Sequence, residues 1–214
     1  MKKIILVLVG CSLLANSHAE PVQMPAANIV AVMQINLAKD DLTLFSTSLI
    51  NESNTIDSLF GELPSGSKVY MWDVKDQAYR VFMKTDRGWG LGGTNTVENG
   101  QGLFIQLPSG VQTNLVITGD VPLDASKNVF SSAGYALLSY PYPHDVLFIN
   151  TEMAQKAAVG DQISFWKNGW TTYTKTASGW LGAEELKLKM GQAFFYRSSQ
   201  NTTYTEPRPF GLQD

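Results

Sequence analysis

Residues 66–72 (GSKVYMW) return 94 residues later as residues 160–166 (GDQISFW). Further matches follow in the same order while their spacing drifts by a few residues, as loop insertions allow. They are residues 88–89 with 179–180 and residues 100–105 with 191–196, at an offset of 91, and Tyr79 with Tyr173, at an offset of 94. An internal repeat of this length indicates that the chain holds two similar structural units.

Between the repeated motifs the chain offers short runs rich in Val, Ile, Thr and aromatic residues, bounded by Gly, Pro, Asn and Asp. Such runs at intervals of about 8–15 residues are typical of an all-β protein. The expected strands are residues 28–37, 42–50, 68–73, 79–84, 102–107, 113–121, 135–140, 146–149, 162–167, 171–176, 193–197 and 202–206.

Helical patterns are sparse, and the two best candidates, residues 54–60 and 151–158, hold the same place in each copy. We therefore predict two antiparallel β modules of about 90 residues with at most one short helix each. A module of that size can hold its own core. Two arrangements stay open, which are tandem sandwiches or barrels and one barrel with pseudo-twofold symmetry. The expected boundaries are 28–128 for the first copy and 129–214 for the second.

The order of the motifs resembles a group of exported bacterial proteins of unassigned function. The shared pattern is Gly-x-x-Val-Tyr-x-Trp, then Gly-Trp, then Gly-Gln-Gly-Phe-Phe, given twice after a signal peptide. The second opening strand, residues 134–142 (GYALLSYPY), keeps the group's form better than residues 41–49 (DLTLFSTSL). The resemblance covers almost all of the chain after the signal and implies a duplicated β fold. It implies no catalytic residues.

The first 19 residues have the anatomy of a secretory signal peptide. A positive start is followed by an apolar run at residues 4–14 and by small residues before Glu20, and the run is too short to span a bilayer. Residues 20–27 form a loose lead. In a second interpretation, Cys11 ends a lipobox and is lipidated, which would anchor the protein to a membrane. We expect an exported protein, either extracellular, on the cell surface or periplasmic.

Composition excludes several classes of protein. Cys11 is the only cysteine, so the mature core folds without disulfides. The formal net charge is −3 and no basic stripe is visible, which argues against a nucleic-acid partner. No second apolar stretch is long enough for a transmembrane segment.

Catalytic and metal-binding patterns are weak. His144 is the only histidine outside the signal, so a Ser-His-Asp triad would need it with Asp145 and a serine such as Ser139. One histidine and no mature cysteine cannot build a usual zinc site, so we predict no metal and no cofactor. A glycosidase needs two facing carboxylates, for which the candidates are Glu62, Glu98, Glu184 and Glu185. We expect a protein that is not an enzyme.

Aromatic residues are the remaining signal. Large aromatics that recur in both copies are expected in the cores, and these are Trp72 with Trp166, Trp89 with Trp180, Tyr79 with Tyr173 and Phe104 with Phe195. Trp170 follows the turn signature Asn168-Gly169, which predicts a hairpin of residues 162–167 with 170–175. Trp170 matches Asp76 in the first copy, so it is the best candidate for an exposed contact. Tyr142 and His144, in a Pro-rich turn, complete the expected ligand-binding residues.

The sequence therefore predicts an exported, non-catalytic β-repeat protein with a structural or adhesive role at or outside the cell surface. Its partners would be further copies of itself or a surface polysaccharide or protein, because exposed strand edges can pair between chains. The first alternative is a carbohydrate-binding module that uses exposed aromatics. The second is a glycosidase-type hydrolase.

Overall fold

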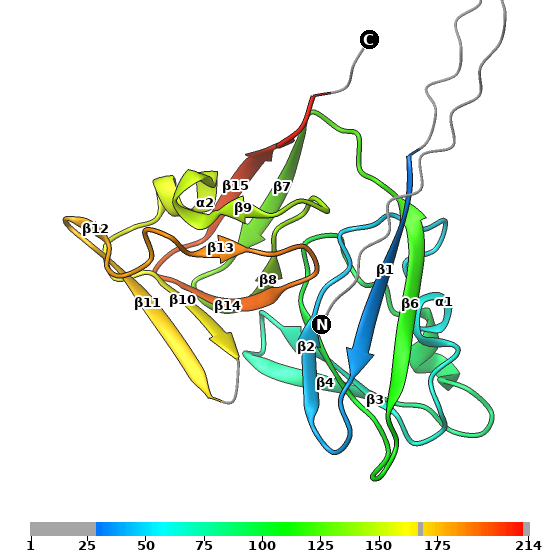
Figure 1. Cartoon of the computed structure of the whole chain (residues 1–214). Helices are drawn as coiled ribbons and strands as arrows, with labels where there is room; N and C mark the ends of the chain where they lie inside the picture. The colour runs from blue at the N-terminus through cyan, green and yellow to red at the C-terminus, as the bar shows by residue number, and fades with distance from the viewer. Residues whose placement is uncertain (1–28, 167–168, 212–214) are drawn as a thin grey trace, which may run out of the picture.

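The computed structural model describes residues 29–166 and 169–211 and confirms an all-β protein with two short α-helices (Figure 1). The signal peptide, the loose lead, Cys11 and Asn168 lie outside the described residues. The first half contains β1 (Val30–Leu37), β2 (Leu42–Phe45), α1 (Ile56–Phe60), β3 (Lys68–Asp73), β4 (Ala78–Met83), the 3₁₀-helix η1 (Gly90–Thr94), β5 (Leu103–Gln106) and β6 (Thr113–Asp120).

The second half begins with β7 (Ser126–Ser131), β8 (Gly134–Ser139), β9 (Val146–Leu147), the 3₁₀-helix η2 (Phe148–Asn150), α2 (Glu152–Lys156) and β10 (Gln162–Trp166). It continues with β11 (Trp170–Thr176), β12 (Gly179–Trp180), β13 (Lys187–Leu188), β14 (Ala193–Ser198) and β15 (Thr202–Pro207). The predicted hairpin of β10 with β11 is confirmed by the pairing of Trp166 with Trp170.

Both halves pair their strands in the same order. The first half forms the sheet β2-β5-β3-β4 and the second forms β8-β14-β10-β11, which β12 extends at its edge. In each half the first and last strands pair separately, β1 with β6 and β7 with β15, and all of these pairs are antiparallel. The two halves therefore share one topology. The second half adds the short pair of β9 with β13, which has no counterpart among the described strands of the first half.

The join between the halves differs from the expected one. The predicted boundary at 128/129 falls inside β7, and β7 was not expected as a strand because its sequence, SKNVFS, is mostly polar. β6 closes the first half against β1, and β7 opens the second half.

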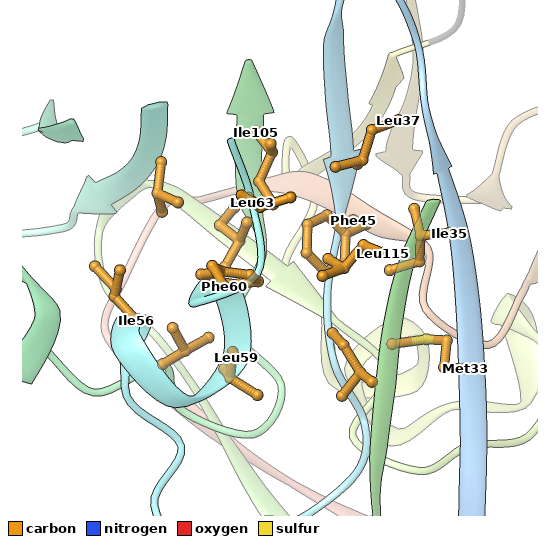
Figure 2. Packing of buried hydrophobic residues seen from close by; sticks show 14 of the residues in the cluster. Met33, Ile35, Leu37, Phe45, Ile56, Leu59, Phe60, Leu63, Ile105 and Leu115 are labelled. Carbon is orange, nitrogen blue, oxygen red and sulfur yellow. The ribbon is translucent and has the colours of Figure 1, made fainter. Parts of the chain in front are cut away.

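Each half has its own hydrophobic core, built by the period-two alternation of its strands. In the first half, Met33, Ile35 and Leu37 point inward from β1 and meet Phe45 and the α1 side chain Phe60 (Figure 2). Phe45 and Phe60 pack edge to face at 6.0 Å. In the second half, Tyr142, Phe148, Phe194, Tyr196 and Tyr204 are the large side chains of the equivalent core.

The repeated Trp89 and Trp180 are buried as predicted and make equivalent hydrogen bonds. Trp89 Nε1 donates to the carbonyl oxygen of Phe60, and Trp180 Nε1 donates to that of Ala154. Both carbonyls belong to the short helices, so each indole fixes a helix against its sheet. Thr55 and Thr151 cap the N-termini of these helices through their side-chain oxygens.

Backbone hydrogen bonds join the halves at related positions. Ser46 N donates to Gly191 O at 3.2 Å, and Ser139 N donates to Gly100 O at 2.8 Å. The hydroxyls of Ser46 and Ser139 hydrogen-bond to each other at 2.7 Å in a buried setting. In the first backbone contact the donor belongs to the first half, and in the second contact the donor belongs to the second half. A pseudo-twofold axis through the serine pair relates the two contacts. The halves thus have separate cores and a continuous junction.

Within the described residues, no helix is both long enough and apolar enough to cross a membrane.

Candidate binding site

The four-stranded sheet of the first half and the five-stranded sheet of the second half each present a second face that does not enter a core. On β3, Val69 and Met71 point into the first core, whereas Lys68, Tyr70 and Trp72 point to the opposite face. On β10, Ile163 and Phe165 point into the second core, and the alternate residues again face away. We call these the cleft faces, because the two of them meet between the halves.

Register shows that Trp170 is the counterpart of Tyr79. Trp72 pairs with Tyr79 across the β3–β4 hairpin, and Trp166 pairs with Trp170 across the β10–β11 hairpin. The alignments of Tyr79 with Tyr173 and of Trp170 with Asp76 are therefore wrong. Six residues separate Trp72 from Tyr79 and three separate Trp166 from Trp170, so the offset between the copies changes from 94 to 91 there.

The cleft faces meet in a cluster of aromatic rings. Trp72 packs edge to face on Phe195 at 5.2 Å and on Tyr79 at 4.9 Å. Trp170 lies 5.5 Å from Phe195, and Tyr79 lies 6.0 Å from Phe104. Edge-to-face pairs at these separations are favourable beyond the burial of the rings. The cluster joins the halves, and its outer rings remain open to solvent.

Two clefts flank Tyr79 and Trp170, which line both of them. The larger, about 390 Å³, adds Tyr135, Gln162, Ser164 and Thr172 together with Trp72 and Phe195. The smaller, about 290 Å³, adds Leu42, Tyr70, Phe104 and Trp166. We call the first the polar cleft and the second the apolar cleft.

The two clefts are related by the same pseudo-twofold axis. Leu42 pairs with Gln106 and Tyr135 pairs with Arg197, so Leu42 and Tyr135 hold equivalent positions. In the same way Tyr70 corresponds to Ser164, Trp72 to Trp166 and Phe104 to Phe195. Each residue of the apolar cleft thus has its counterpart in the polar cleft. The fold provides one site twice, with different side chains.

Hydrogen-bonding groups concentrate in the polar cleft. The Ser164 and Thr172 hydroxyls lie 2.8 Å apart, and Gln162 Nε2 donates to the Thr174 hydroxyl at 3.4 Å. In the apolar cleft, the Tyr70 hydroxyl donates to Gln106 Oε1 at 2.7 Å. Partial burial raises the pKa of Tyr79 above its ordinary value. Its hydroxyl, like that of any tyrosine at neutral pH, is protonated and can donate a hydrogen bond.

The β3–β4 hairpin is held in place by contacts with the second half. Trp72 Nε1 donates to the Tyr135 carbonyl at 2.8 Å. Gln77 Nε2 donates to the same carbonyl at 3.0 Å, and Tyr135 N donates to Gln77 Oε1 at 2.7 Å. These three bonds fix the Trp72 indole and the Tyr135 backbone, which together form one end of the polar cleft.

The structure separates the three predicted ligand-binding residues. Trp170 is 49% exposed and lines both clefts. Tyr142 is instead fully buried in the second core, where its hydroxyl donates to the Asp124 carbonyl at 2.9 Å. His144 is exposed in its turn and lines neither cleft; its ring lies 6.4 Å from that of Phe210. Tyr142 is therefore a packing residue, since a fully buried side chain cannot meet a ligand.

The catalytic candidates are dispersed. Ser139 is buried and bonded to Ser46, and Asp145 accepts a hydrogen bond from the Met190 backbone. None of the four candidate glutamates lines either cleft, although Glu62 lines a separate pocket of about 350 Å³ together with Asp57. In the part of the chain that is described, no group of three or more His, Cys, Asp or Glu residues could hold a metal ion. The clefts offer aromatic surfaces and hydrogen bonds, which suit binding.

Sequence reasoning missed most of the site. Tyr79 and Trp166 were expected in the cores because they recur or align with recurring residues, yet they are 41% and 38% exposed. Phe104 and Phe195 are buried as predicted, but in the cluster between the halves. The sequence signal for the site was the pattern of residues 68–72. Successive residues on a strand point to opposite faces, and on β3 the residues of both faces are largely apolar or aromatic. A strand with two such faces covers two surfaces.

No protein-family model, no curated protein and no solved structure matches this chain.

Proposed function

We propose that this protein is a non-catalytic glycan-binding protein that acts at or outside the cell surface. The observation that carries the proposal is the pair of related clefts that share the exposed side chains Tyr79 and Trp170. Exposed Trp and Tyr rings supply flat apolar surfaces on which the C–H faces of sugar rings can stack. Ser164, Thr172 and Gln162 supply donors and acceptors for sugar hydroxyls beside them.

Two connected clefts suit an extended ligand. Tyr79 and Trp170 line both clefts, so a chain that enters the polar cleft passes these rings before it reaches the apolar cleft. The lining differs between the ends, which favours one direction for the chain. Adhesion to a surface polysaccharide needs this kind of binding and requires no reaction, in agreement with the role expected from the sequence.

The test is binding of the purified protein to a panel of neutral and acidic polysaccharides, measured by calorimetry and by tryptophan fluorescence. Trp170→Ala is expected to weaken binding by about tenfold or more, because an exposed aromatic anchor is worth about 1.4 kcal/mol or more in a binding site. Phe130→Ala is the matched control, since Phe130 is 56% exposed on β7 and lines neither cleft. The control should bind as the wild type does.

Two results would contradict the proposal. One is the absence of binding to every polysaccharide. The other is equal affinity of the Trp170→Ala variant and the wild type, provided that both unfold at the same denaturant concentration.

Self-association is a second candidate, favoured by the edge strand β4. Among the described residues no strand pairs with β4 on its outer side, and Val81 and Met83 on it are 52% and 54% exposed. An exposed apolar edge strand can pair with another chain. Light scattering over a range of concentrations tests this role, and a monomer at every concentration would exclude it. Val81→Lys should abolish any oligomer that forms through this edge.

A further inference from the structure

On the cleft faces, a charged residue occurs at one related position in each half. In the first half, Lys68 on β3 pairs with Gln106 on β5. In the second, Gln162 on β10 pairs with Arg197 on β14. The pseudo-twofold axis superposes Lys68 on Gln162 and Gln106 on Arg197. Each half therefore has one cation and one glutamine in this pair of positions. In the first half the cation lies on β3, and in the second half it lies on β14, the counterpart of β5.

Both pairs lie beside the aromatic rings. Lys68 is two residues before Tyr70 on the same strand, and Arg197 is two residues after Phe195, so both point to the cleft faces. Arg197 is exposed, and its guanidinium carbon lies 5.9 Å from the centre of the Tyr135 ring, which lines the polar cleft. Gln162 lines the same cleft. One cation thus lies on the cleft face of each half, next to a residue that lines a cleft: Lys68 two positions from Tyr70, and Arg197 over the Tyr135 ring.

These cations are not neutralised within the described residues. Neither forms an ion pair with a carboxylate there, and the two salt bridges present, Lys127–Asp124 and Lys156–Glu152, lie elsewhere. No Asp or Glu occupies a cleft-facing position on the described strands of these two sheets. The cleft-facing strand positions therefore carry two cations and no acid, in a chain whose formal net charge is −3. This local excess favours an anionic group on the ligand.

We infer that the glycan bound here is an acidic polysaccharide, with anionic groups held by the Arg197–Gln162 and Lys68–Gln106 pairs and sugar rings stacked on Tyr79 and Trp170. This inference rests on the proposed function. A guanidinium binds a carboxylate or a sulfate through paired N–H donors, and the neighbouring amide donates a further hydrogen bond. Two such pairs, one for each cleft, suit a chain with repeated charges.

The experiment compares polymers that differ only in charge. Polygalacturonate and its full methyl ester test carboxylates, and dextran sulfate and dextran test sulfates. The expected result is binding to at least one anionic polymer, at least about tenfold tighter than to its neutral form, since a charge-assisted pair is worth 1.5–3 kcal/mol. The pair of polymers that shows the difference identifies the anionic group.

Arg197→Gln and Lys68→Gln test the two pairs. Glutamine already occupies each of these positions in the opposite half, so the fold accommodates it. Each variant is expected to weaken binding of the anionic polymer about tenfold and to leave binding of the neutral polymer unchanged. Arg87→Gln is the matched control, because Arg87 is exposed in the turn after β4 and makes the same change of net charge. It should bind as the wild type does.

The outcomes separate this inference from the function on which it rests. Equal affinity for charged and uncharged polymers would overturn the acidic ligand and leave glycan binding in place. The absence of binding to all four polymers and to the wider panel would overturn both. Tighter binding to a single-stranded oligonucleotide than to any polysaccharide would also overturn both, since aromatic rings with nearby cations can stack on bases.

Discussion

The two halves agree in their cores and differ in their clefts. Trp89 and Trp180 are buried at equivalent positions, and each donates its indole N–H to a carbonyl of the short helix beside it. On the cleft faces, Tyr70 stands where the second half has Ser164, and Leu42 stands where it has Tyr135. A core position must fill a fixed volume, whereas a cleft position only has to remain compatible with solvent or a ligand. The clefts are therefore where the halves can specialise.

The largest effect is expected for the equivalent core tryptophans. Trp89→Ala and Trp180→Ala should each lower the free energy of unfolding by about 3–5 kcal/mol, because each leaves a large cavity and removes a hydrogen bond to a helix. Urea unfolding followed by circular dichroism measures the change. Trp166→Ala is the control from the cleft, and its smaller burial predicts a smaller loss. Unequal losses for Trp89 and Trp180 would show that the two cores are not equivalent.

A smaller effect is expected at the junction, where Gly102 lies beside Ala193, the residue at the equivalent position of the second half. A Cβ atom on Gly102 would lie 2.7 Å from the Ala193 Cβ and 2.9 Å from the Leu137 Cγ. Gly102→Ala should therefore destabilise the protein by about 1–3 kcal/mol through overpacking. Adding Ala193→Gly exchanges the two residues across the axis and should restore part of the loss. A Gly102→Ala variant as stable as the wild type would contradict this prediction, because it would mean that the junction shifts to accommodate the added methyl group.

The smallest effect concerns a buried position where the halves differ in charge. The inward residues of β6 are Leu115 and Ile117, and those of β15 are Tyr204 and Glu206. Glu206 accepts hydrogen bonds from the Glu152 and Met153 backbone N–H groups at the start of α2. Burial raises the pKa of Glu206, and the two backbone hydrogen bonds only partly oppose this shift.

A raised carboxyl pKa means that the folded state binds the proton more tightly than the unfolded state. The stability from Glu206 is then fully present below the ordinary glutamate pKa, about 4.3, and declines as pH rises through the raised value. Glu206→Gln removes the titrating group but keeps only one of the two acceptor oxygens, so its stability relative to the wild type should be more favourable at pH 7 than at about pH 4. The test is to measure the urea midpoint of unfolding for the wild type and for Glu206→Gln, at pH 7 and at about pH 4. A difference that does not change with pH would contradict the expected titration.

Much of the fold was predictable from local pattern. The all-β class, the position of both helices, the β10–β11 hairpin and most strands follow from alternation and turn residues, because these act over a few neighbouring residues. The exceptions have physical causes. β7 is mostly polar and is a strand because β15 pairs with it. Residues 46–50 leave the strand after β2 because Ser46 bonds to the second half and Ile50 to Asp120.

The site was predictable only in part. Trp170 was identified from its turn, but its counterpart Tyr79 and its neighbour Trp166 were assigned to cores. Recurrence in both copies indicated that these residues matter to each unit, and it did not show which face of the sheet they occupy. Tyr142 was expected to be a ligand-binding residue in a Pro-rich turn, yet it fills the second core. Such assignments depend on which surfaces meet, and that is set by residues far apart in the chain.

The sequence by itself determined the repeat, the all-β class and the alternation that gives each strand two faces. Those properties depend on side-chain period and turn chemistry, which are local. Only the tertiary structure decided that the second faces of the two sheets meet, with Phe104 and Phe195 packed between the halves and Tyr79 and Trp170 left at the surface. The clefts form there because the joined edges, near Ser46 and Ser139, set the two sheets against each other. Contacts of that range have no signature in a short stretch of sequence.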